Sequence, residues 1–293
     1  MRDSAKTITE TGEDYDIIRI TGKHVSKDIK VYSSAVASGE GWIITESGKL
    51  IVYPDFVCGW NGYIDSVTSI EVKEGVKTLS ENAFALGNDG IEVKLPYSLE
   101  SIDAGTFGGK KISVVSYDGT AGETFAAENS LPFTSLGDAG DCGMDVFWFY
   151  KDGVLTISGT GTTPEVKING WGKPETSPWY KYYDNIEKIV VDENVTTLSG
   201  ACFHYMGKTK FVEITPNLKK LSGTVFETMG NLVSIYYKGE TPVTGEANIR
   251  FVDNLTLNYT FDGCGKFRSF VLSDKAAGTI GTEAFKGTSV VEL

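Results

Sequence analysis

Hydrophobic residues recur along the chain at four positions separated by steps of +4, +3 and +5, and the whole set returns after 23 residues. The complete copies are Val72, Val76, Leu79, Phe84; Leu95, Leu99, Ile102, Phe107; Val191, Val195, Leu198, Phe203; and Ile214, Leu218, Leu221, Phe226. A weaker fifth copy, with one extra residue in its middle, contains Leu272, Ile280 and Phe285. Each copy opens with alternating hydrophobic residues, as in Ile70-Glu71-Val72, and continues into a polar turn. The pattern predicts one short β-strand in every repeat.

A unit of 23 residues is too short to bury its hydrophobic side alone, so the copies are expected to stack as a solenoid. Stacking would place Phe84 over Phe107 and Phe203 over Phe226 as short aromatic ladders. Truncating one buried Phe to Ala should cost about 3–5 kcal/mol. The residue before each Phe is small or modest in size, which predicts a second packed row: Ala83, Thr106, Cys202, Val225 and Ala284. Cys202 is therefore expected to be a core thiol rather than a reactive one.

A lead-in segment also occurs twice, once before each set of repeats. Trp42 aligns with Phe147, and Trp60 aligns with Trp179. Each lead-in predicts a β-hairpin, and the two turns are at Ser47-Gly48 and Asp152-Gly153. The second copy carries 14 extra residues within 158–178, which predicts a surface loop. The whole chain is therefore predicted to be mostly β with short helices and turns, in two duplicated modules that each begin with a β-hairpin.

The first module is predicted to cover residues 1–137. It contains an N-terminal β segment with strands near 15–20 and 29–32, a hairpin, two repeats and a capping helix. The sequence from Thr120 to Glu123 has the form of a capping box, and Pro132 prevents the helix from continuing. This helix would cover the open end of the first stack, because an exposed terminal repeat leaves a hydrophobic face in water.

The second module is predicted to cover residues 138–293, with the second hairpin and the remaining repeats. A short helix is expected to begin at Ser177-Pro178, with Ser as the N-cap. The last residues, 290–293, read like the start of another repeat strand. This favours a chain that has been cut from a longer protein over one that ends naturally here.

Composition narrows the functional classes. The formal net charge is −12, from 27 basic and 39 acidic residues, which disfavours binding to nucleic-acid backbones. No hydrophobic run is long enough to span a membrane, and the N-terminus lacks the hydrophobic core of a signal peptide. The four cysteines form no Cys-x-x-Cys pair, so isolated buried thiols are favoured over a metal site, and disulfide pairing is left open.

Two segments resemble a known family. The segments from Ser69 to Phe84 and from Lys188 to Leu198 resemble the BspA-type leucine-rich repeat of bacterial surface proteins. The lead-in from Phe147 to Gly161 is also similar to that family's characteristic segment. The resemblance covers roughly residues 42–293. It implies a leucine-rich-repeat solenoid and a location outside the cell or on its surface, but it implies no activity, because such families share a scaffold rather than a chemical site.

No catalytic constellation stands out in the sequence. Nucleophile-elbow, zinc-protease, phosphate-loop and dinucleotide-binding motifs are missing, and the chain has two histidines. His204 is interpreted as a surface residue of a repeat turn rather than a ligand. The segment Asp138-Ala139-Gly140-Asp141 lacks the regular ligand series of a calcium loop and is interpreted as a linker turn. We therefore expect a non-enzymatic protein with no metal and no cofactor.

The remaining candidate site is the outward face of the strands. If Ile70, Val93, Ile189 and Val212 point inward, their neighbours point outward. One outward row would contain Glu71, Lys94, Val190 and Glu213. The neighbouring row would contain Ser69, Glu92, Lys188 and Phe211, with Phe211 as an anchor for a partner. An ordinary solvated sheet face with no partner remains the alternative. The ligand-binding candidates are Glu71, Lys94, Lys188, Val190, Phe211 and Glu213.

A second candidate surface is aromatic. It comprises Trp179, Tyr180, Tyr182 and Tyr183, with Trp171 in the predicted loop. These rings could stack on sugars, but sealing the end of the second stack is the favoured interpretation.

The leading hypothesis is a non-enzymatic cell-surface repeat protein that mediates adhesion or binds an extracellular or host protein, or a glycan. The alternatives are a passive spacer in a larger envelope protein and a glycan-binding or glycan-cleaving module. No nucleic-acid partner and no membrane insertion are expected, and the sequence leaves the oligomeric state open.

Overall fold

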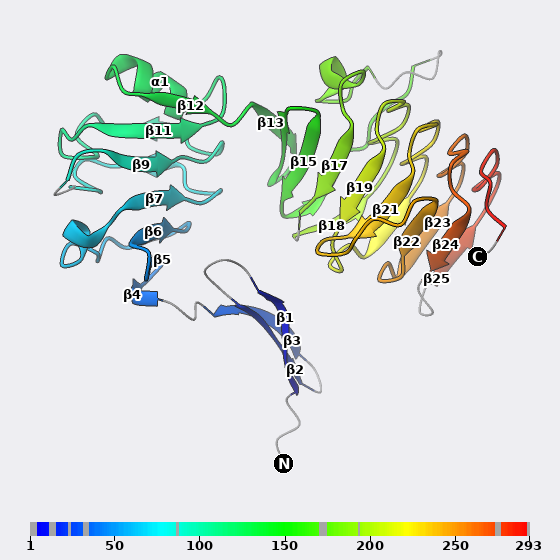
Figure 1. Cartoon of the computed structure of the whole chain (residues 1–293), viewed down its shortest axis with the longest axis horizontal. Coiled ribbons are helices and arrows are strands. Elements are labelled where there is room, and N and C mark those ends of the chain that lie inside the picture. The colour runs from blue at the N-terminus through cyan, green and yellow to red at the C-terminus, as the bar shows by residue number, and fades with distance from the viewer. Residues whose placement is uncertain are drawn as a thin grey trace. The chain divides into compact units, whose positions relative to one another are not determined.

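The chain forms two compact units, unit 1 at Met1–Leu136 and unit 2 at Gly137–Leu293 (Figure 1). The computed structural model describes residues 5–11, 16–22, 25–31, 35–85, 88–169, 175–192, 194–272 and 277–291. Trp171 and the last residue, Leu293, lie outside these residues, and so does His24, the other of the two histidines. No helix in the described ranges has the length and hydrophobicity needed to cross a membrane.

The N-terminal segment is a three-stranded antiparallel sheet in the order β1-β2-β3. Its strands are β1 (Ala5–Thr11), β2 (Asp16–Gly22) and β3 (Val25–Val31). The strands predicted near 15–20 and 29–32 overlap β2 and β3, whereas β1 was missed. Tyr15 and Tyr32, at the ends of the predicted strands, fall outside the described residues.

Unit 1 is built on a seven-stranded sheet in the order β12-β11-β9-β7-β6-β5-β4. Three strands form an antiparallel lead-in: β4 (Ala35–Gly39), β5 (Trp42–Thr45) and β6 (Lys49–Val52). The others continue in parallel: β7 (Ser69–Val72), β9 (Ile91–Lys94), β11 (Ile112–Ser116) and β12 (Phe133–Ser135). The far side of the coils carries the short pair β8 (Thr78–Leu79) and β10 (Ser101–Ile102), and the turn η1 (Ile64–Ser66) lies between β6 and β7.

Unit 2 repeats this plan with two sheets (Figure 1). The first has the order β13-β14-β15-β17-β19-β21-β22-β24. Its strands are β13 (Asp138–Gly143), β14 (Val146–Lys151), β15 (Val154–Gly159), β17 (Lys188–Val191), β19 (Phe211–Ile214), β21 (Ser234–Tyr237), β22 (Glu246–Ile249) and β24 (Ser269–Leu272). The second contains β16 (Gly161–Thr162), β18 (Val195–Leu198), β20 (Lys220–Ser222), β23 (Asn254–Leu257) and β25 (Ala277–Ile280).

One coil of unit 2 contributes to the first sheet alone. β21 pairs in parallel with β19 on one side and β22 on the other, whereas β20 pairs directly with β23 in the second sheet. The chain therefore returns from β21 to β22 without forming a strand in the second sheet. This short coil interrupts the 23-residue spacing, which explains why the periodic pattern fades after Phe226 and why Phe261 was missed as a repeat position.

The aromatic ladders predicted from the repeat are confirmed in both units, and both are longer than predicted. In unit 1, Phe84 stacks on Phe107 at 5.6 Å between ring centroids, and Trp60 stacks on Phe84 at 5.3 Å. In unit 2 the ladder continues through five rings: Trp179, Phe203, Phe226, Phe261 and Phe285, with successive centroids 5.9, 6.0, 5.6 and 5.7 Å apart. Phe84, Phe203, Phe226 and Phe261 are at most 1% exposed, so the ladders form the centre of each core.

The second hairpin turns where predicted, but the alignment of the two lead-ins is wrong by one residue. Asp152 and Gly153 both have positive φ, as a two-residue hairpin turn requires. The first hairpin has a longer turn, because Ile44 pairs with Leu50 whereas Tyr150 pairs with Leu155. Trp42 therefore corresponds to Trp148 and not to Phe147.

A glycine opposite each of these tryptophans supports the corrected alignment. Gly39 pairs with Trp42, and Gly140 pairs with Trp148. At either glycine a Cβ atom would overlap the indole ring of its partner. Both rings are buried, at 5% and 6% exposure. Glycine is required at these two edge-strand positions because the indole lies across the backbone.

Both helices predicted from the sequence form, but the residues at their N-terminal ends make other contacts than predicted, or the helix begins later. Helix α1 (Ala121–Glu128) follows Thr120 and caps unit 1, but the Thr120 hydroxyl donates to the carbonyl of Tyr117, and the Glu123 carboxylate accepts from the amide of Gly119. The short helix of unit 2 is the single turn η2 (Tyr180–Tyr182), so the start predicted at Ser177-Pro178 is too early.

Candidate functional site

The outward faces of the two parallel sheets carry the residues that the sequence singled out. The expected inward residues are buried in each unit, with Ile70 and Val212 at 1% exposure or less. Of the six outward candidates, Lys94 is exposed, and the other five are half-buried: Glu71, Lys188, Val190, Phe211 and Glu213. The side-chain alternation of the strands is therefore confirmed, although long neighbours cover much of each outward side chain.

The single outward row expected from the sequence is divided between two sheets. Glu71 pairs with Lys94 in the sheet of unit 1, whereas Val190 pairs with Glu213 in the first sheet of unit 2. The repeat predicts each neighbouring pair correctly, but it cannot show that the sheets are separate, because both modules share one spacing. Each unit is therefore considered as a site of its own.

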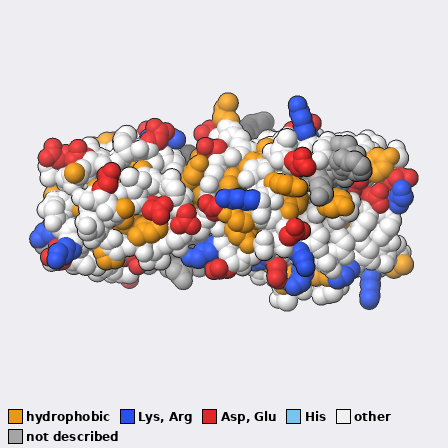
Figure 2. Space-filling view, turned by 90° about the horizontal axis from the view of Figure 1, so that it is seen from above, with side chains coloured by type: hydrophobic (Ala, Val, Ile, Leu, Met, Phe, Trp, Pro, Cys, Tyr) orange, Lys and Arg blue, Asp and Glu red, His pale blue; other side chains and the backbone are white. Residues whose placement is uncertain are grey.

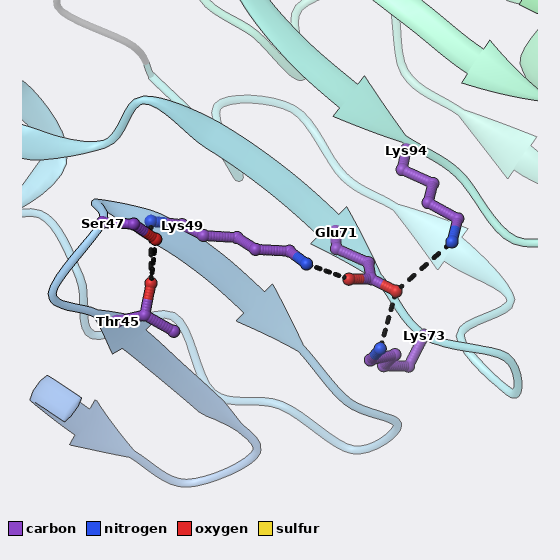
Figure 3. Close-up of polar contacts among 6 residues, drawn as sticks. All are labelled: Thr45, Ser47, Lys49, Glu71, Lys73 and Lys94. Atoms are coloured by element: carbon purple, nitrogen blue, oxygen red, sulfur yellow. Dashed lines mark hydrogen bonds and ion pairs between the residues drawn. The ribbon is translucent and has the colours of Figure 1, made fainter. Parts of the chain in front are cut away.

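In unit 1, three lysines converge on the carboxylate of Glu71 (Figure 3). The ammonium nitrogens of Lys49, Lys73 and Lys94 lie 2.7, 2.6 and 3.6 Å from its oxygens. Lys49 comes from the preceding strand β6, Lys94 from the following strand β9, and Lys73 lies two residues after Glu71 on the same side of the chain. We call these four residues the Glu71 cluster.

The Glu71 carboxylate is held firmly in its charged form. Burial by itself would raise its pKa, but the charge of Lys73 and the hydrogen bonds from Lys49 and Lys73 outweigh this effect and lower the pKa to about 2. Burial also lowers the pKa of Lys73, which the charge of Glu71 opposes. Three ammonium groups face a single carboxylate, so the cluster carries a positive excess.

In unit 2, a polar chain crosses three strands. Lys188 on β17 pairs with Glu213 on β19 at 2.7 Å, and the hydroxyl of Tyr236 on β21 donates to the same carboxylate at 3.0 Å. The ammonium of Lys188 also lies 5.8 Å from the centre of the Tyr236 ring. Burial opposes the charged form of Lys188, but the hydrogen bonds with Glu213 and Tyr236 raise its pKa overall. The charges on this face are thus satisfied internally.

Hydrophobic side chains flank this polar chain. Val190 lies beside Glu213, and Phe211 lies beside Lys188 and Ser234. Figure 2, which views the molecule from above, shows hydrophobic side chains with charged groups between them on the surface turned to the viewer. We call Lys188, Val190, Phe211, Glu213 and Tyr236 the unit 2 face.

Two buried polar atoms lie on the same side of this sheet. Ser234 is fully buried and Asn248 is 7% exposed, yet the Ser234 hydroxyl and the Asn248 carbonyl oxygen have no hydrogen-bond partner among the described residues. Unpaired polar atoms in a buried position are costly unless something pairs with them. They extend the polar character of the unit 2 face towards β22.

Lys49, Lys73 and Tyr236 were missed by the sequence analysis. A signal existed for Lys73, because a residue two positions after Glu71 in a strand lies on the same face. Lys49 precedes the repeats in the hairpin, so the 23-residue pattern does not reach it. Tyr236 lies 23 residues after Glu213, so continuing the outward row by one more repeat would have found it.

The aromatic group near η2 seals unit 2, as the favoured interpretation predicted. Trp179 is fully buried and Tyr183 is 7% exposed. Tyr182 stacks on Tyr150 with centroids 3.8 Å apart, and its hydroxyl donates to Asp138. Because these rings pack against the core or against one another, they offer little open surface for a sugar.

Two chemical interpretations from the sequence are corrected. His204 is buried at 3% exposure, with its Nδ1 3.4 Å from a carboxylate oxygen of Glu227, so it is not a surface residue. The segment Asp138–Gly143 is strand β13, not a linker turn. Within the described ranges, no group of three His, Cys, Asp or Glu side chains is placed to hold a metal.

The four cysteines are free thiols. Cys142, Cys202 and Cys264 are buried, and burial raises the pKa of each thiol to about 12, which confirms that Cys202 is a core residue. Cys58 differs, because it is exposed on the loop before Trp60, so the expectation of a buried thiol is wrong at this position.

Solved structures that resemble this chain share little sequence with it. No curated protein matches the chain. Among solved structures, it is similar to a leucine-rich repeat protein from Eubacterium ventriosum, with 19% identity and a TM-score of 0.31 over 47% of this chain and 44% of that one. The chain thus spans less than half the length of that protein. It is also similar to the pneumococcal vaccine antigen PcpA, with 13% identity and a TM-score of 0.27 over 92% of this chain and 82% of that one.

The family comparison coincides with the stacked coils. A model of the BspA type leucine rich repeat region, in 6 copies, matches residues 62–125 and 177–293, which is more than half of the sequence. The first matched segment contains β7, β9 and β11 with Phe84 and Phe107, and the second contains β17 to β25 with the whole ladder of unit 2. The chain therefore belongs to the BspA-type leucine-rich repeat family.

Proposed function

We propose that this protein is a non-enzymatic repeat protein, presented outside the cell or on its surface, that adheres to a protein partner through the unit 2 face. The observation that carries the proposal is the composition of this face. Val190 and Phe211 offer half-buried hydrophobic surface beside the Lys188–Glu213 pair, whose charges already satisfy each other. A partner that covers the face gains hydrophobic contact without leaving a charge unpaired.

The titratable groups of both outward faces support a binding role over a catalytic one. General acids and bases work best when their pKa lies near the working pH. The pKa of Glu71 is instead lowered to about 2, and the pKa of Lys188 is raised above its usual value. Such groups act as fixed charges. Membership of a family that shares a scaffold rather than a chemical site supports the same proposal.

The experiment is a binding screen of the purified chain against purified extracellular proteins and glycans, followed by a comparison of variants. Phe211→Ser and Val190→Ser change the unit 2 face, and Val243→Ser is the matched control because Val243 is 54% exposed on a loop of the same unit. For a protein partner, we expect Phe211→Ser to weaken binding about tenfold or more and Val243→Ser to change it by less than about twofold.

Other outcomes would separate the alternatives. Equal binding by all three variants would reject the unit 2 face as the contact surface. Binding to no protein and no glycan by a well-folded sample would favour a passive spacer. Binding to a glycan alone, with a change in tryptophan fluorescence, would favour a carbohydrate-binding module over a protein-binding one.

A further inference from the structure

The Glu71 cluster concentrates basic residues in a part of the chain that is otherwise acidic. Residues 35–136 contain six lysines, no arginine and 14 acidic residues. Three of these six lysines lie within 3.6 Å of the Glu71 carboxylate. The chain as a whole has a net charge of −12. A local positive excess on such a chain attracts an anionic group to this face and repels it from most of the remaining surface.

The geometry leaves donors available for a second anion. Each ammonium group has three hydrogen-bond donors, and one Glu71 carboxylate cannot occupy all those of Lys73 and Lys94, which lie beside the same carboxylate oxygen. The side chains of Lys49, Lys73 and Lys94 are 33%, 37% and 47% exposed. Their nitrogens approach Glu71 from two neighbouring strands and from its own strand, as Figure 3 shows. An anionic oxygen arriving from solvent can therefore contact at least two ammonium groups at once.

The residues on either side of the cluster favour a peptide over a sugar. In the row across the sheet, Ile51 pairs with Glu71, and Val115 pairs with Lys94. Both flanking residues are aliphatic, and Val115 is half-buried. Sugars are held mainly by stacking on aromatic rings, and this row contains none. An extended peptide that places a carboxylate at the lysines and an aliphatic side chain beside Val115 matches the row.

We propose that the Glu71 cluster is a binding site for an acidic peptide segment, with an Asp or Glu side chain of the peptide bridging Lys73 and Lys94. This inference rests on the proposed function because it also takes the partner to be a protein. The site that it concerns lies in unit 1. Glu71 orders the lysines in the free protein and competes with the peptide carboxylate for their donors. The site thus combines an internal carboxylate with an external one around shared ammonium groups.

The test uses the full chain and fluorescein-labelled hexaglutamate, with binding followed by fluorescence anisotropy at about 20 mM and about 150 mM NaCl. The cluster variant is Lys73→Gln with Lys94→Gln. The control is Lys77→Gln with Lys111→Gln, which removes the same charge from unit 1 outside the cluster. Circular dichroism and thermal melting show whether each variant is folded, and Lys94→Gln alone replaces the double variant if that one is unstable.

We expect the cluster variant to bind hexaglutamate about tenfold or more weakly than the wild type, and the control to lie within about twofold of it. Glu71→Gln should bind several times more tightly, because it removes the competing carboxylate and keeps the lysines. An equal loss in cluster and control variants would show dependence on net charge alone and overturn the proposal. Weaker binding by a folded Glu71→Gln variant, or no binding by the wild type, would also overturn it.

A competition experiment tests whether the cluster binds a sulfated polysaccharide instead of an acidic peptide. Dextran sulfate competes with hexaglutamate, and the two affinities are compared at equal concentrations of negative charge. If dextran sulfate binds at the cluster at least tenfold more tightly, the site belongs to a sulfated polysaccharide and the peptide proposal is wrong. Hexaglutamate binding to the Glu71 cluster does not depend on the unit 2 face. Phe211→Ser should leave hexaglutamate binding unchanged, so a failure of the proposed function and a failure of this inference are distinguishable.

Discussion

Removing the ring of Phe226, in the middle of the unit 2 ladder, is the most direct test of the stacked aromatic core. Its ring is 1% exposed and lies between Phe203 at 6.0 Å and Phe261 at 5.6 Å. Truncation to Ala removes buried hydrophobic surface and leaves a cavity, at a cost of about 3–5 kcal/mol. Two ring contacts are also lost, each worth about 0.5–1.5 kcal/mol, which places the expected cost towards the upper end of that range.

Hydrogen exchange measured by mass spectrometry can follow each unit separately. In Phe226→Ala, amides of β19 and β20 that exchange through opening of unit 2 should exchange at least about 100-fold faster, as a loss of about 3 kcal/mol implies. Amides of β7 and β9 in unit 1 should be unaffected. Phe251→Ala is the control, because Phe251 is 41% exposed and lies outside the ladder.

A destabilisation of less than about 1 kcal/mol in Phe226→Ala would show that the stacked ring is not central to the core. It would mean that the ring contributes little to burial and that the coils are held together by their strand pairing alone. An equal effect in Phe251→Ala would contradict it as well, because exposed and buried rings would then be equivalent.

Three further predictions concern charge, thiols and the lead-in. Glu71 has its pKa lowered from 4.5 to about 2 in the folded chain, so its stabilisation is complete above about pH 4.5 and is lost as the pH falls towards 2. Urea unfolding should show wild type more stable than Glu71→Gln by about 2–3 kcal/mol at pH 7 and nearly equal at pH 2; a difference independent of pH would contradict this. Thiol titration with Ellman's reagent should detect Cys58 in the native chain and all four thiols in denaturant, and rapid reaction of a second native thiol would be inconsistent with the burial described. Gly140→Ala should lower stability by about 1–3 kcal/mol in thermal unfolding, because the new Cβ overlaps the Trp148 indole, whereas Gly62→Ala, which meets no atom within 4 Å, should not.

The repeat spacing was sufficient to predict these ring pairs because each Phe occupies the same position within its 23-residue coil. Phe84 and Phe107 are separated by one full coil, and so are Phe203 and Phe226. Phe261 could not be found in this way, because the coil that carries β21 has no strand in the second sheet. Strand pairing, not sequence spacing, brings Phe261 against Phe226.

The candidate site was predictable in part. Period-2 alternation placed Glu71, Lys94 and Phe211 on outward faces correctly. Alternation cannot reveal how far a long side chain reaches across strands, so the convergence of Lys49 on Glu71 emerged from the structure alone. His204 was misplaced for a similar reason. A polar residue in a turn is usually exposed, but this turn packs beneath the Glu227 turn of the next coil.

A protein partner bound to the unit 2 face must shield the side chains of that face from solvent. Hydroxyl-radical footprinting of the chain, with and without a partner found in the screen, tests it directly because oxidation reports the exposure of individual side chains. Phe211 is half-buried in the free chain and should lose most of its remaining reactivity in the complex. Phe251, exposed and outside the face, should keep its reactivity. Unchanged oxidation of Phe211 together with protection of Phe251 would contradict the account.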